Sequence, residues 1–243
     1  MRIVLATSNP HKHEEIQTIF NACEQAGSKQ RGDSDRFAET DTSPSPHIHL
    51  IPLTDLPPVS EPIEDQPTFA GNAILKARCY ASATGRICLA DDSGLEVDAL
   101  NGEPGIRSAR YAAITGPRDI VDPANNKRLL RKLHEIPLEK RTACFVCAMA
   151  LCQPYGQEPP LALVHGSIEG RILTTEEAGP SARGRGKHGF GYDPLFFIPY
   201  LGRTTAELSP EQKNQISHRG CAARKMWQAI FDLRSSNGIK PAT

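Results

Sequence analysis

Short apolar runs and longer amphipathic segments follow one another along the chain. Seven short runs rich in aliphatic, β-branched and aromatic residues predict strands at about 2–6, 48–53, 86–90, 95–100, 141–152, 161–173 and 195–199. Four segments with apolar residues at helical spacing predict helices at about 10–23, 67–83, 122–136 and 210–233. Because strands and helices alternate, the pattern predicts an α/β fold, here with a mixed sheet.

The predicted helix boundaries carry recognisable chemical signals. Asn9 and Asp122 each precede a proline, which suits an N-cap followed by the first helical residue. Ser209 and Gln212 have the spacing of a capping box, and Gly85 is placed to end a helix. These signals locate the starts of three helices and the end of a fourth.

The segment 24–47 contains almost no apolar residue and is dominated by Ser, Asp, Gly and Pro. This composition predicts a solvated, flexible polar insertion between the first helix and the second strand. A chain of 243 residues can form one large domain or two small ones. We expect a single domain over residues 1–243 that contains this insertion.

The overall charge gives no preference for a charged partner. Lys plus Arg and Asp plus Glu both number 28, so no net charge attracts nucleic acid or an acidic membrane surface. No apolar run is long enough to cross a membrane, and the apolar start of the chain is too short for a signal peptide core. We therefore expect a soluble, cytoplasmic protein that binds neither nucleic acid nor membrane.

The seven cysteines agree with that expectation. Their number is odd, and several lie inside apolar runs. In the strand predicted at 141–152, Cys144 and Cys147 would point to opposite faces, and no second pair with metal-ligand spacing accompanies them. We interpret the cysteines as structural, rather than as a zinc or redox site.

Two segments have the groups needed to bind phosphate. The first, "TSNPHK", joins a strand to a helix start with its free N–H groups, and consists of Thr7, Ser8, Asn9, Pro10, His11 and Lys12. The second places Lys76 on one helix face with Asn72, beside small alanines that leave room for a ligand. The alternatives are an ordinary helix cap and two solvated surface lysines.

The stretch "ADDSGL" places Asp91 and Asp92 side by side after an apolar run. Adjacent carboxylates repel, so the pair suggests a nearby cation. Mg²⁺ takes carboxylate oxygens and usually bridges to substrate phosphates, and Asp91, Asp92 and Glu64 could supply such oxygens. The alternative is a solvated turn at the end of a strand.

The C-terminal third has features suited to a flat ligand. Glycines at 189 and 191 allow close backbone approach around Phe190, whose ring could stack on a base. Three residues near the last helix could meet phosphates or base carbonyls: Lys213, His218 and Arg219. Taken with the phosphate and metal candidates, these predict a nucleoside triphosphate site. Neither the P-loop pattern nor the dinucleotide-binding glycine pattern is present.

Five segments in order resemble the inosine triphosphate pyrophosphatase family, also called Ham1-like: "LATSNPHK", "TFAGNAILKA", "ADDSGLEVDALNGEPGIRSARYA", "GFGYDPLF" and "TAELSPEQKNQISHRG". The resemblance covers nearly the whole chain. It implies an elongated two-lobed α/β fold around a long mixed sheet, with the active cleft between the lobes. It also implies a homodimer that uses Mg²⁺ to hydrolyse ITP, dITP and XTP to the monophosphate and pyrophosphate.

The same resemblance implies roles for individual residues. The segment from Thr7 to Lys12 and Lys76 would hold the triphosphate, with Asp92 and Lys76 as catalytic residues. Asp92 would be the proton acceptor and a metal ligand, and Ser93 would contact the substrate. The loop around the base would consist of Phe190, Gly191, Tyr192 and Asp193. The residues that contact the base and read its 6-oxo group would be Lys213, His218 and Arg219.

Some assignments stay open. Glu64 is our choice for the second metal carboxylate, with Glu61 or Asp65 as alternatives. The chain also departs from the family pattern at Gly71, where many members carry a glutamate. A related nucleotide pyrophosphatase with another substrate is one rival function. The other is a nucleic-acid-binding module that uses the basic residues of the loop at 183–188.

Overall fold

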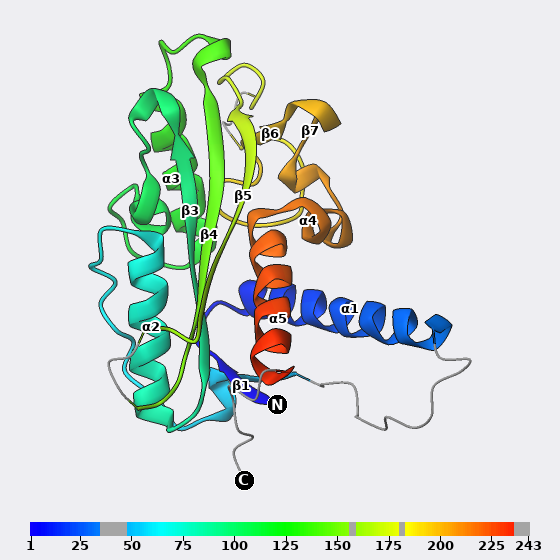
Figure 1. Ribbon diagram of the computed structural model, residues 1–243. Helices are drawn as coiled ribbons and strands as arrows, with labels where there is room; N and C mark the ends of the chain where they lie inside the picture. The colour runs from blue at the N-terminus through cyan, green and yellow to red at the C-terminus, as the bar shows by residue number, and fades with distance from the viewer. Residues whose placement is uncertain (35–47, 156–158, 180–182, 236–243) are drawn as a thin grey trace. The chain divides into compact units, whose positions relative to one another are not determined.

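A seven-stranded mixed sheet carries the fold, in the strand order β2-β1-β3-β4-β5-β6-β7 (Figure 1). The computed structural model describes residues 1–34, 48–155, 159–179 and 183–235. The strands are β1 (Arg2–Leu5), β2 (His49–Pro52), β3 (Cys88–Val97), β4 (Thr142–Cys152), β5 (Ala162–Ile172), β6 (Phe196–Ile198) and β7 (Arg203–Thr204). β1 pairs in parallel with β2 and β3, whereas β6 pairs antiparallel with β5 and β7.

The described residues also form five α-helices: α1 (Pro10–Ser34), α2 (Phe69–Thr84), α3 (Arg118–Lys132), α4 (Pro210–Ile216) and α5 (His218–Ser235). Short 3₁₀ turns occupy several of the connections, among them Gly105–Arg110 and Thr205–Glu207. The predicted α/β class with a mixed sheet is confirmed.

The chain divides into two units by its internal contacts. Unit 1 comprises the described residues of Met1–Asp91, Ala148–His165 and Ala222–Thr243, and unit 2 comprises those of Asp92–Cys147 and Gly166–Cys221. The strands β3, β4 and β5 and the helix α5 each begin in one unit and end in the other.

In unit 1, Ile3, Val4 and Leu5 of β1 are fully buried, whereas Arg2 is exposed. Further buried apolar side chains of this unit come from β3 and from α1, α2 and α5, including Ile16, Phe20, Ala73, Ala77, Leu89, Met226 and Ile230. The alanines of α2 allow close approach of the helix, and Gly85 ends that helix in the left-handed conformation with a φ of 65°. The predicted helix at 67–83 and its stop at Gly85 are confirmed.

Unit 2 packs α3 against the sheet. Leu129, Leu130 and Leu133 share one apolar cluster with Leu95 of β3 and Phe196 of β6. Figure 1 shows α3 running beside β3, as this cluster requires.

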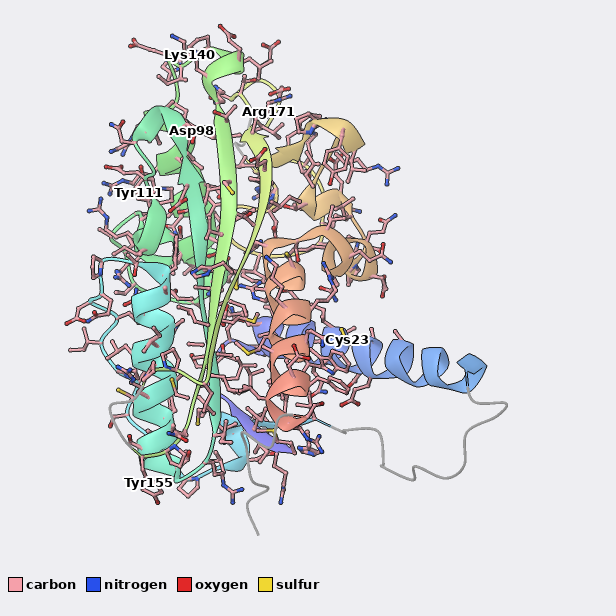
Figure 2. All side chains as sticks on the ribbon, in the orientation of Figure 1. Cys23, Asp98, Tyr111, Lys140, Tyr155 and Arg171 are labelled. Carbon is pink, nitrogen blue, oxygen red and sulfur yellow. The ribbon has the colours of Figure 1, made fainter. Side chains whose placement is uncertain are left out.

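Tyr111, a member of this apolar cluster, is linked to two charged side chains. The Tyr111 hydroxyl (labelled in Figure 2) donates to Glu103 Oε2 at 2.9 Å, and Lys132 Nζ lies 2.7 Å from the same oxygen. Burial, and next the Glu103 carboxylate, raise the pKa of Tyr111 to about 12. An uncharged tyrosine hydroxyl therefore connects the apolar cluster to the Glu103–Lys132 ion pair.

A fully buried arginine satisfies the carbonyl groups at the C-terminal end of α3. Arg141 has only 2 % of its surface exposed, and its guanidinium donates to the carbonyls of Leu133, Ile136 and Leu173. Burial lowers the pKa of Arg141. The side chain serves as an internal cap for α3 and for the end of β5, and it shares the Leu133 carbonyl with the N–H of Ile136.

Helix α1 continues beyond the predicted end near Cys23, as far as Ser34. The prediction that the polar insertion begins at residue 24 was therefore wrong for residues 24–34. The reason is local propensity, because Glu24, Gln25 and Ala26 are good helix formers and no proline follows before Ser34. Residues 35–47, the rest of the predicted insertion, lie outside the described residues.

The two short strands predicted at 86–90 and 95–100 are one continuous strand, β3. The alternative interpretation of "ADDSGL" as a solvated turn is wrong, because Asp91 to Gly94 lie within the strand. Local propensity favours a turn here, but pairing in the sheet overrides it. The buried carboxylates are tolerated because each finds a donor, as the next subsection describes.

Two helix boundaries also differ from the prediction. Helix α3 starts at Arg118, with Pro117 at the N-cap, so Asp122 and Pro123 lie in its second turn. Asp122 is not the cap, because its carboxylate binds a distant backbone N–H instead. The last predicted helix is divided into α4 and α5 at Ser217, whose backbone is extended at φ −68° and ψ 157°.

We predict that Arg141→Met lowers the free energy of unfolding by about 3 kcal/mol, because the carbonyls of Ile136 and Leu173 lose the guanidinium donor. Urea unfolding of the two proteins measures this difference. Arg131→Met, at an exposed position of α3, is the matched control. An Arg141→Met protein with the unfolding midpoint of that control would contradict the interpretation.

Candidate active site

The junction of β1 and α1 has the predicted cap. Asn9 Oδ1 accepts the N–H of His11 at 3.1 Å, and Thr7 Oγ1 accepts the N–H of Asn9 at 3.2 Å. Pro10 is the first helical residue, so the predicted helix start is confirmed. The hydroxyl and amide side chains thus order the backbone between strand and helix, at the positive end of the α1 dipole.

Two lysines of unit 1 are each paired with one of the candidate carboxylates. Lys12 Nζ lies 2.9 Å from Asp91 Oδ2, and Asp91 is 1 % exposed. Lys76 Nζ lies 2.9 Å from Glu64 Oε1, with the Lys76 side chain 8 % exposed. An opposite charge at this distance favours the ionised carboxylate, so Lys12 compensates the repulsion expected at Asp91.

An open pocket of about 580 Å³ lies beside this junction in unit 1. Its walls are Thr7 to Pro10 and His13, the segment around 52–61, and Tyr80 of α2. Burial first, and then the Glu61 carboxylate, raise the pKa of Tyr80. Glu61 therefore faces this pocket, whereas Glu64 is bound to Lys76 and Asp65 is exposed.

In unit 2, Asp92 and Ser93 lie next to the start of α5. Arg219 Nη2 donates to Ser93 Oγ at 2.8 Å, and Arg219 is 2 % exposed. The N–H of Ser93 donates to Asp92 Oδ1 at 3.0 Å. Ser217 Oγ accepts the N–H of Gly220 at 3.0 Å, and the His218 ring stacks on Phe145 with centroids 4.9 Å apart. "SHRG" is thus a capped helix start that holds two cationic or titratable side chains in place.

The loop at 189–193 is organised by one buried carboxylate. Asp193 Oδ2 accepts the N–H of Phe190 at 2.8 Å and the ammonium of Lys213 at 2.8 Å, and Thr205 Oγ1 donates to Asp193 Oδ1 at 2.9 Å. The Lys213 and Asp193 side chains are only 6 % and 4 % exposed. Gly189 has a φ of 78°, and a Cβ there would lie 2.1 Å from Asp193 Oδ2, so only glycine fits.

Three cationic side chains surround the Phe190 ring. The distances to the ring centroid are 4.9 Å from Lys213 Nζ, 5.3 Å from Arg118 Cζ and 5.6 Å from Arg219 Cζ. A ring in such surroundings attracts cations electrostatically and presents a flat apolar surface. The site therefore combines an aromatic platform with donors suited to carbonyl or phosphate oxygens.

The structure thus places the sequence-predicted residues in two groups. Unit 1 holds the segment from Thr7 to Lys12 together with Glu64, Lys76 and Asp91. Unit 2 holds Asp92, Ser93, Phe190, Gly191, Tyr192, Asp193, Lys213, His218 and Arg219. Within unit 2, Ser93 contacts Arg219, and Phe190 contacts Lys213, Arg219 and Asp193.

Sequence reasoning missed the contribution of α3. Asp122 Oδ2 accepts the N–H of Gly191 at 2.8 Å, and Asn126 Nδ2 donates to the Gly191 carbonyl at 3.0 Å. Arg118, Asp122 and Asn126 are spaced by four residues, so they lie on one helix face, and that spacing was the available signal. It was hidden because Asp122 before Pro123 suggested a helix cap.

The basic loop at 183–188 is attached to the rest of unit 2. The N–H of Arg185 donates to the Pro194 carbonyl, and the N–H groups of Lys187 and His188 donate to the Ala206 carbonyl. The Arg185 guanidinium lies 5.0 Å from the Phe197 ring centroid, and Arg171 (labelled in Figure 2) lies 4.3 Å from the same ring. Arg185 thus packs against an aromatic ring, which leaves fewer charges for a nucleic-acid surface.

The described part of the chain contains all seven cysteines, and all of them are free thiols. No group of three or more His, Cys, Asp or Glu residues there is arranged to hold a metal ion. None of the helices in those residues is long and apolar enough to span a membrane.

Comparisons with known proteins agree with one another. A family model described as the Ham1 family matches residues 3–229. The chain is 40% identical to a "dITP/XTP pyrophosphatase" of Desulforamulus reducens, over 96% of this chain and 97% of that protein. It is 46% identical to one of Bacillus cereus, over 94% of each. Solved structures of Ham1 proteins from Coxiella burnetii and Staphylococcus aureus each align with a TM-score of 0.71 and 35% identity, over 96% of this chain and 99% of theirs.

We predict that Asp193→Asn lowers the free energy of unfolding by about 3–5 kcal/mol, because the buried Lys213 ammonium loses its counter-ion. The double variant Asp193→Asn with Lys213→Met removes that uncompensated charge and should regain part of the loss. A double-mutant cycle in urea measures the coupling. Strictly additive effects of the two changes would show that the ion pair does not hold the loop.

Proposed function

Because the chain belongs to the Ham1 family, we propose that it hydrolyses the non-standard purine nucleoside triphosphates ITP, dITP and XTP. The products are the nucleoside monophosphate and pyrophosphate, and the reaction removes these nucleotides from the nucleotide pool. The observation that carries the proposal is the match, over nearly the whole of both chains, to relatives named dITP/XTP pyrophosphatase.

The residues of unit 1 have the chemistry of a triphosphate site. The backbone from Thr7 to Pro10 is ordered at a helix start, whose dipole favours an anion, and Lys12 and Lys76 supply ammonium groups. Charge develops on the phosphate oxygens during attack at phosphorus, so cations placed there stabilise the transition state. We assign the triphosphate to the segment from Thr7 to Lys12 and to Lys76.

The carboxylates suit Mg²⁺, which needs only one or two protein oxygens beside water and substrate phosphates. Glu64 and Asp92 would hold the ion, and its charge would neutralise the phosphates when bound. Glu64 is favoured over its neighbours because it lies at 2.9 Å from Lys76, next to the expected phosphates. Glu61 and Asp65 remain the alternatives. Asp92, which is 7 % exposed, would accept the proton of the attacking water.

The residues of unit 2 have the chemistry of a purine site. Phe190 offers a stacking surface held by Asp193, and Gly191 and Tyr192 complete the loop. Arg219, Lys213 and His218 supply donors, and Ser93 is already within hydrogen-bond distance of Arg219. Hypoxanthine and xanthine present a 6-oxo acceptor where adenine presents an amino donor. A buried cationic side chain can therefore donate a hydrogen bond to the 6-oxo group of the first two bases. It finds no acceptor at that position of adenine, which is thereby disfavoured.

We also propose that the enzyme acts as a homodimer in the cytoplasm, as the resemblance implies. The rival nucleic-acid-binding function is disfavoured by the backbone attachment of the 183–188 loop and by the balanced charge. A related pyrophosphatase with different substrates is the closer rival.

A substrate panel tests the proposed function. We expect pyrophosphate release from ITP, dITP and XTP in the presence of Mg²⁺, with much slower release from ATP, GTP and dUTP. Only the first three are purines that have a 6-oxo acceptor and no 2-amino group. ATP lacks the 6-oxo group, GTP has the 2-amino group, and dUTP has a pyrimidine ring. EDTA should abolish the release, and added Mg²⁺ should restore it. Equal rates on ATP and ITP would favour the rival pyrophosphatase, and salt-sensitive nucleic-acid binding without hydrolysis would favour the binding module.

We predict that Asp92→Asn lowers kcat by about 10²–10⁴-fold, the usual effect of removing a general base. Asparagine keeps the size of the side chain and can still accept the Ser93 N–H, so the fold should persist. Steady-state kinetics and thermal unfolding measure the two effects. Asp98→Asn, at an exposed residue after the same strand, is the control. Near-normal turnover in Asp92→Asn would remove Asp92 from the mechanism.

A further inference from the structure

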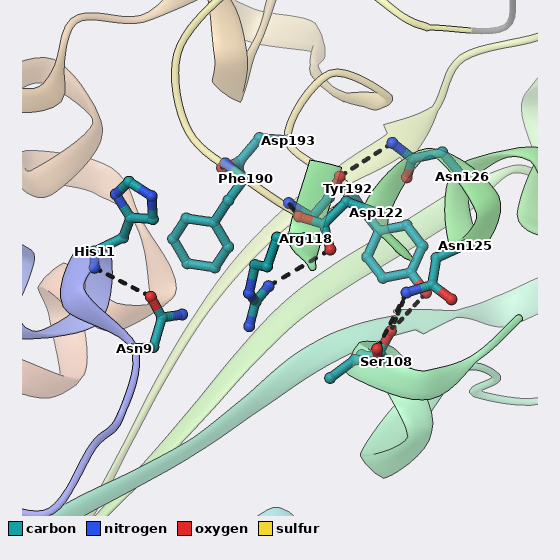
Figure 3. A network of polar contacts seen from close by, with 12 residues as sticks. Asn9, His11, Ser108, Arg118, Asp122, Asn125, Asn126, Phe190, Tyr192 and Asp193 are labelled. Atoms are coloured by element: carbon teal, nitrogen blue, oxygen red, sulfur yellow. Dashed lines mark hydrogen bonds and ion pairs between the residues drawn. The ribbon is translucent and has the colours of Figure 1, made fainter. Parts of the chain in front are cut away.

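One face of helix α3 is turned toward the loop that carries Phe190 (Figure 3). Arg118, Asp122 and Asn126 lie one turn apart on that face, and Figure 3 shows them beside Phe190 and Tyr192. All of these residues belong to unit 2. None of the three was assigned a part in catalysis or substrate binding above.

Two side chains of this face hold the two peptide groups that flank Gly191. Asp122 Oδ2 accepts the N–H of Gly191 at 2.8 Å, which fixes the peptide between Phe190 and Gly191. Asn126 Nδ2 donates to the Gly191 carbonyl at 3.0 Å, which fixes the next peptide. Gly191 itself has a φ of 63°, a conformation that glycine adopts without strain and readily leaves. The two contacts therefore select one conformation at the most adaptable point of the loop.

On the other side of Phe190, Asp193 holds the remaining backbone donor. The N–H of Phe190 binds Asp193 Oδ2 at 2.8 Å, so the peptide groups before and after Phe190 are both held by aspartates. The Phe190 backbone is consequently fixed from two elements, the loop itself and α3.

Asp122 also connects the loop to a cation. Its second oxygen, Oδ1, lies 3.5 Å from Arg118 Nη1, and the Arg118 guanidinium is 5.3 Å from the Phe190 ring centroid. The Arg118 side chain is 47% exposed and that of Asp122 is 15% exposed. An ion pair this exposed adds little stability, so its clearer effect is to orient the two side chains at the loop.

A purely structural explanation for this face is less adequate. The neighbouring Asn125 already fixes the 108–112 segment, since it accepts the Ala112 N–H at 2.6 Å and donates to the Ser108 carbonyl at 3.3 Å. Within the described residues, the hydrogen bonds of the Asp122 and Asn126 side chains go to the glycine after Phe190, and Asp122 also forms an ion pair with Arg118. Their bonds thus act on the loop to which the purine is assigned.

We propose that Asp122 and Asn126 are positioning residues that preorganise the Phe190–Gly191 loop for purine recognition. The proposal rests on the proposed function, which places the base on Phe190. A loop that is ordered before binding does not lose conformational entropy when the substrate arrives. Without the two contacts, this loss of conformational entropy would weaken substrate binding. The Phe190 ring would also no longer present a single orientation to the base.

The test compares Asp122→Ala with the wild-type enzyme on ITP, XTP and ATP in the presence of Mg²⁺. We expect KM for ITP and XTP to rise about tenfold with kcat changed little, since one charge-assisted hydrogen bond is lost. The preference for ITP over ATP should fall as well. Asp122→Asn keeps an acceptor oxygen for the Gly191 N–H and should restore most of the affinity. Asp119→Ala, at an exposed residue in the first turn of α3, is the matched control.

Hydrogen exchange of the Gly191 amide supplies a second readout that needs no activity. The exchange should be faster in Asp122→Ala than in Asp119→Ala, because only the first loses the acceptor. A fall in kcat with unchanged KM and equal protection of Gly191 would reduce Asp122 to a structural role and overturn the proposal. If the wild-type enzyme hydrolyses no triphosphate, the proposed function fails. Equal protection of Gly191 in the two variants would then overturn the positioning role by itself.

Discussion

The buried carboxylate of Asp193 is the constraint on which the arrangement of the residues that we propose to bind the purine depends. It accepts a backbone N–H, an ammonium group and a hydroxyl, from Phe190, Lys213 and Thr205. A buried charge is stable only when it is paired and hydrogen-bonded. The Asp193 carboxylate can therefore be buried only if all three donors lie within hydrogen-bond distance of it. This requirement fixes the loop, the start of the 3₁₀ turn at Thr205 and the helix α4 relative to one another within unit 2.

The same rule applies in unit 1 with different partners. The chain has no net charge, and its candidate catalytic charges cancel in pairs, Lys12 with Asp91 and Lys76 with Glu64. Each pair places an ammonium group 2.9 Å from a carboxylate oxygen. A triphosphate is bound by cations and a divalent metal ion by carboxylates. The two ion pairs place both kinds of group next to each other. Neutrality of the whole chain therefore does not conflict with a strongly charged site.

Much of the fold could be predicted from the sequence because it depends on local rules. The helix starts at Asn9 and Ser209 and the stop at Gly85 follow from capping chemistry, and all three hold in the structure. The failures have tertiary causes. The segment "DDSG" stays in a strand because sheet pairing and Lys12 outweigh its turn propensity. Asp122 looked like a cap because its true partner, Gly191, is 69 residues away in sequence.

The candidate site also has one part that could be predicted from the sequence and one part that could not. Residue types and order pointed to the phosphate, metal and purine groups, since each of these depends on a short segment. The residues that hold those groups in place could not be found so directly, because a positioning residue has no chemistry of its own that marks it. Asn126, Thr205 and Asp122 are recognised only when the loop they contact is known.

The strand β3 shows how one short motif can serve both groups. Successive residues of a strand point to opposite faces, so adjacent carboxylates need not share a partner. Asp91 pairs with Lys12 in unit 1, whereas Asp92 belongs to unit 2 and accepts the N–H of Ser93, whose hydroxyl binds Arg219. The division between the units falls between these two residues. The repulsion that the sequence implies is thus relieved by geometry as well as by Lys12, and the two carboxylates of "DD" have different partners.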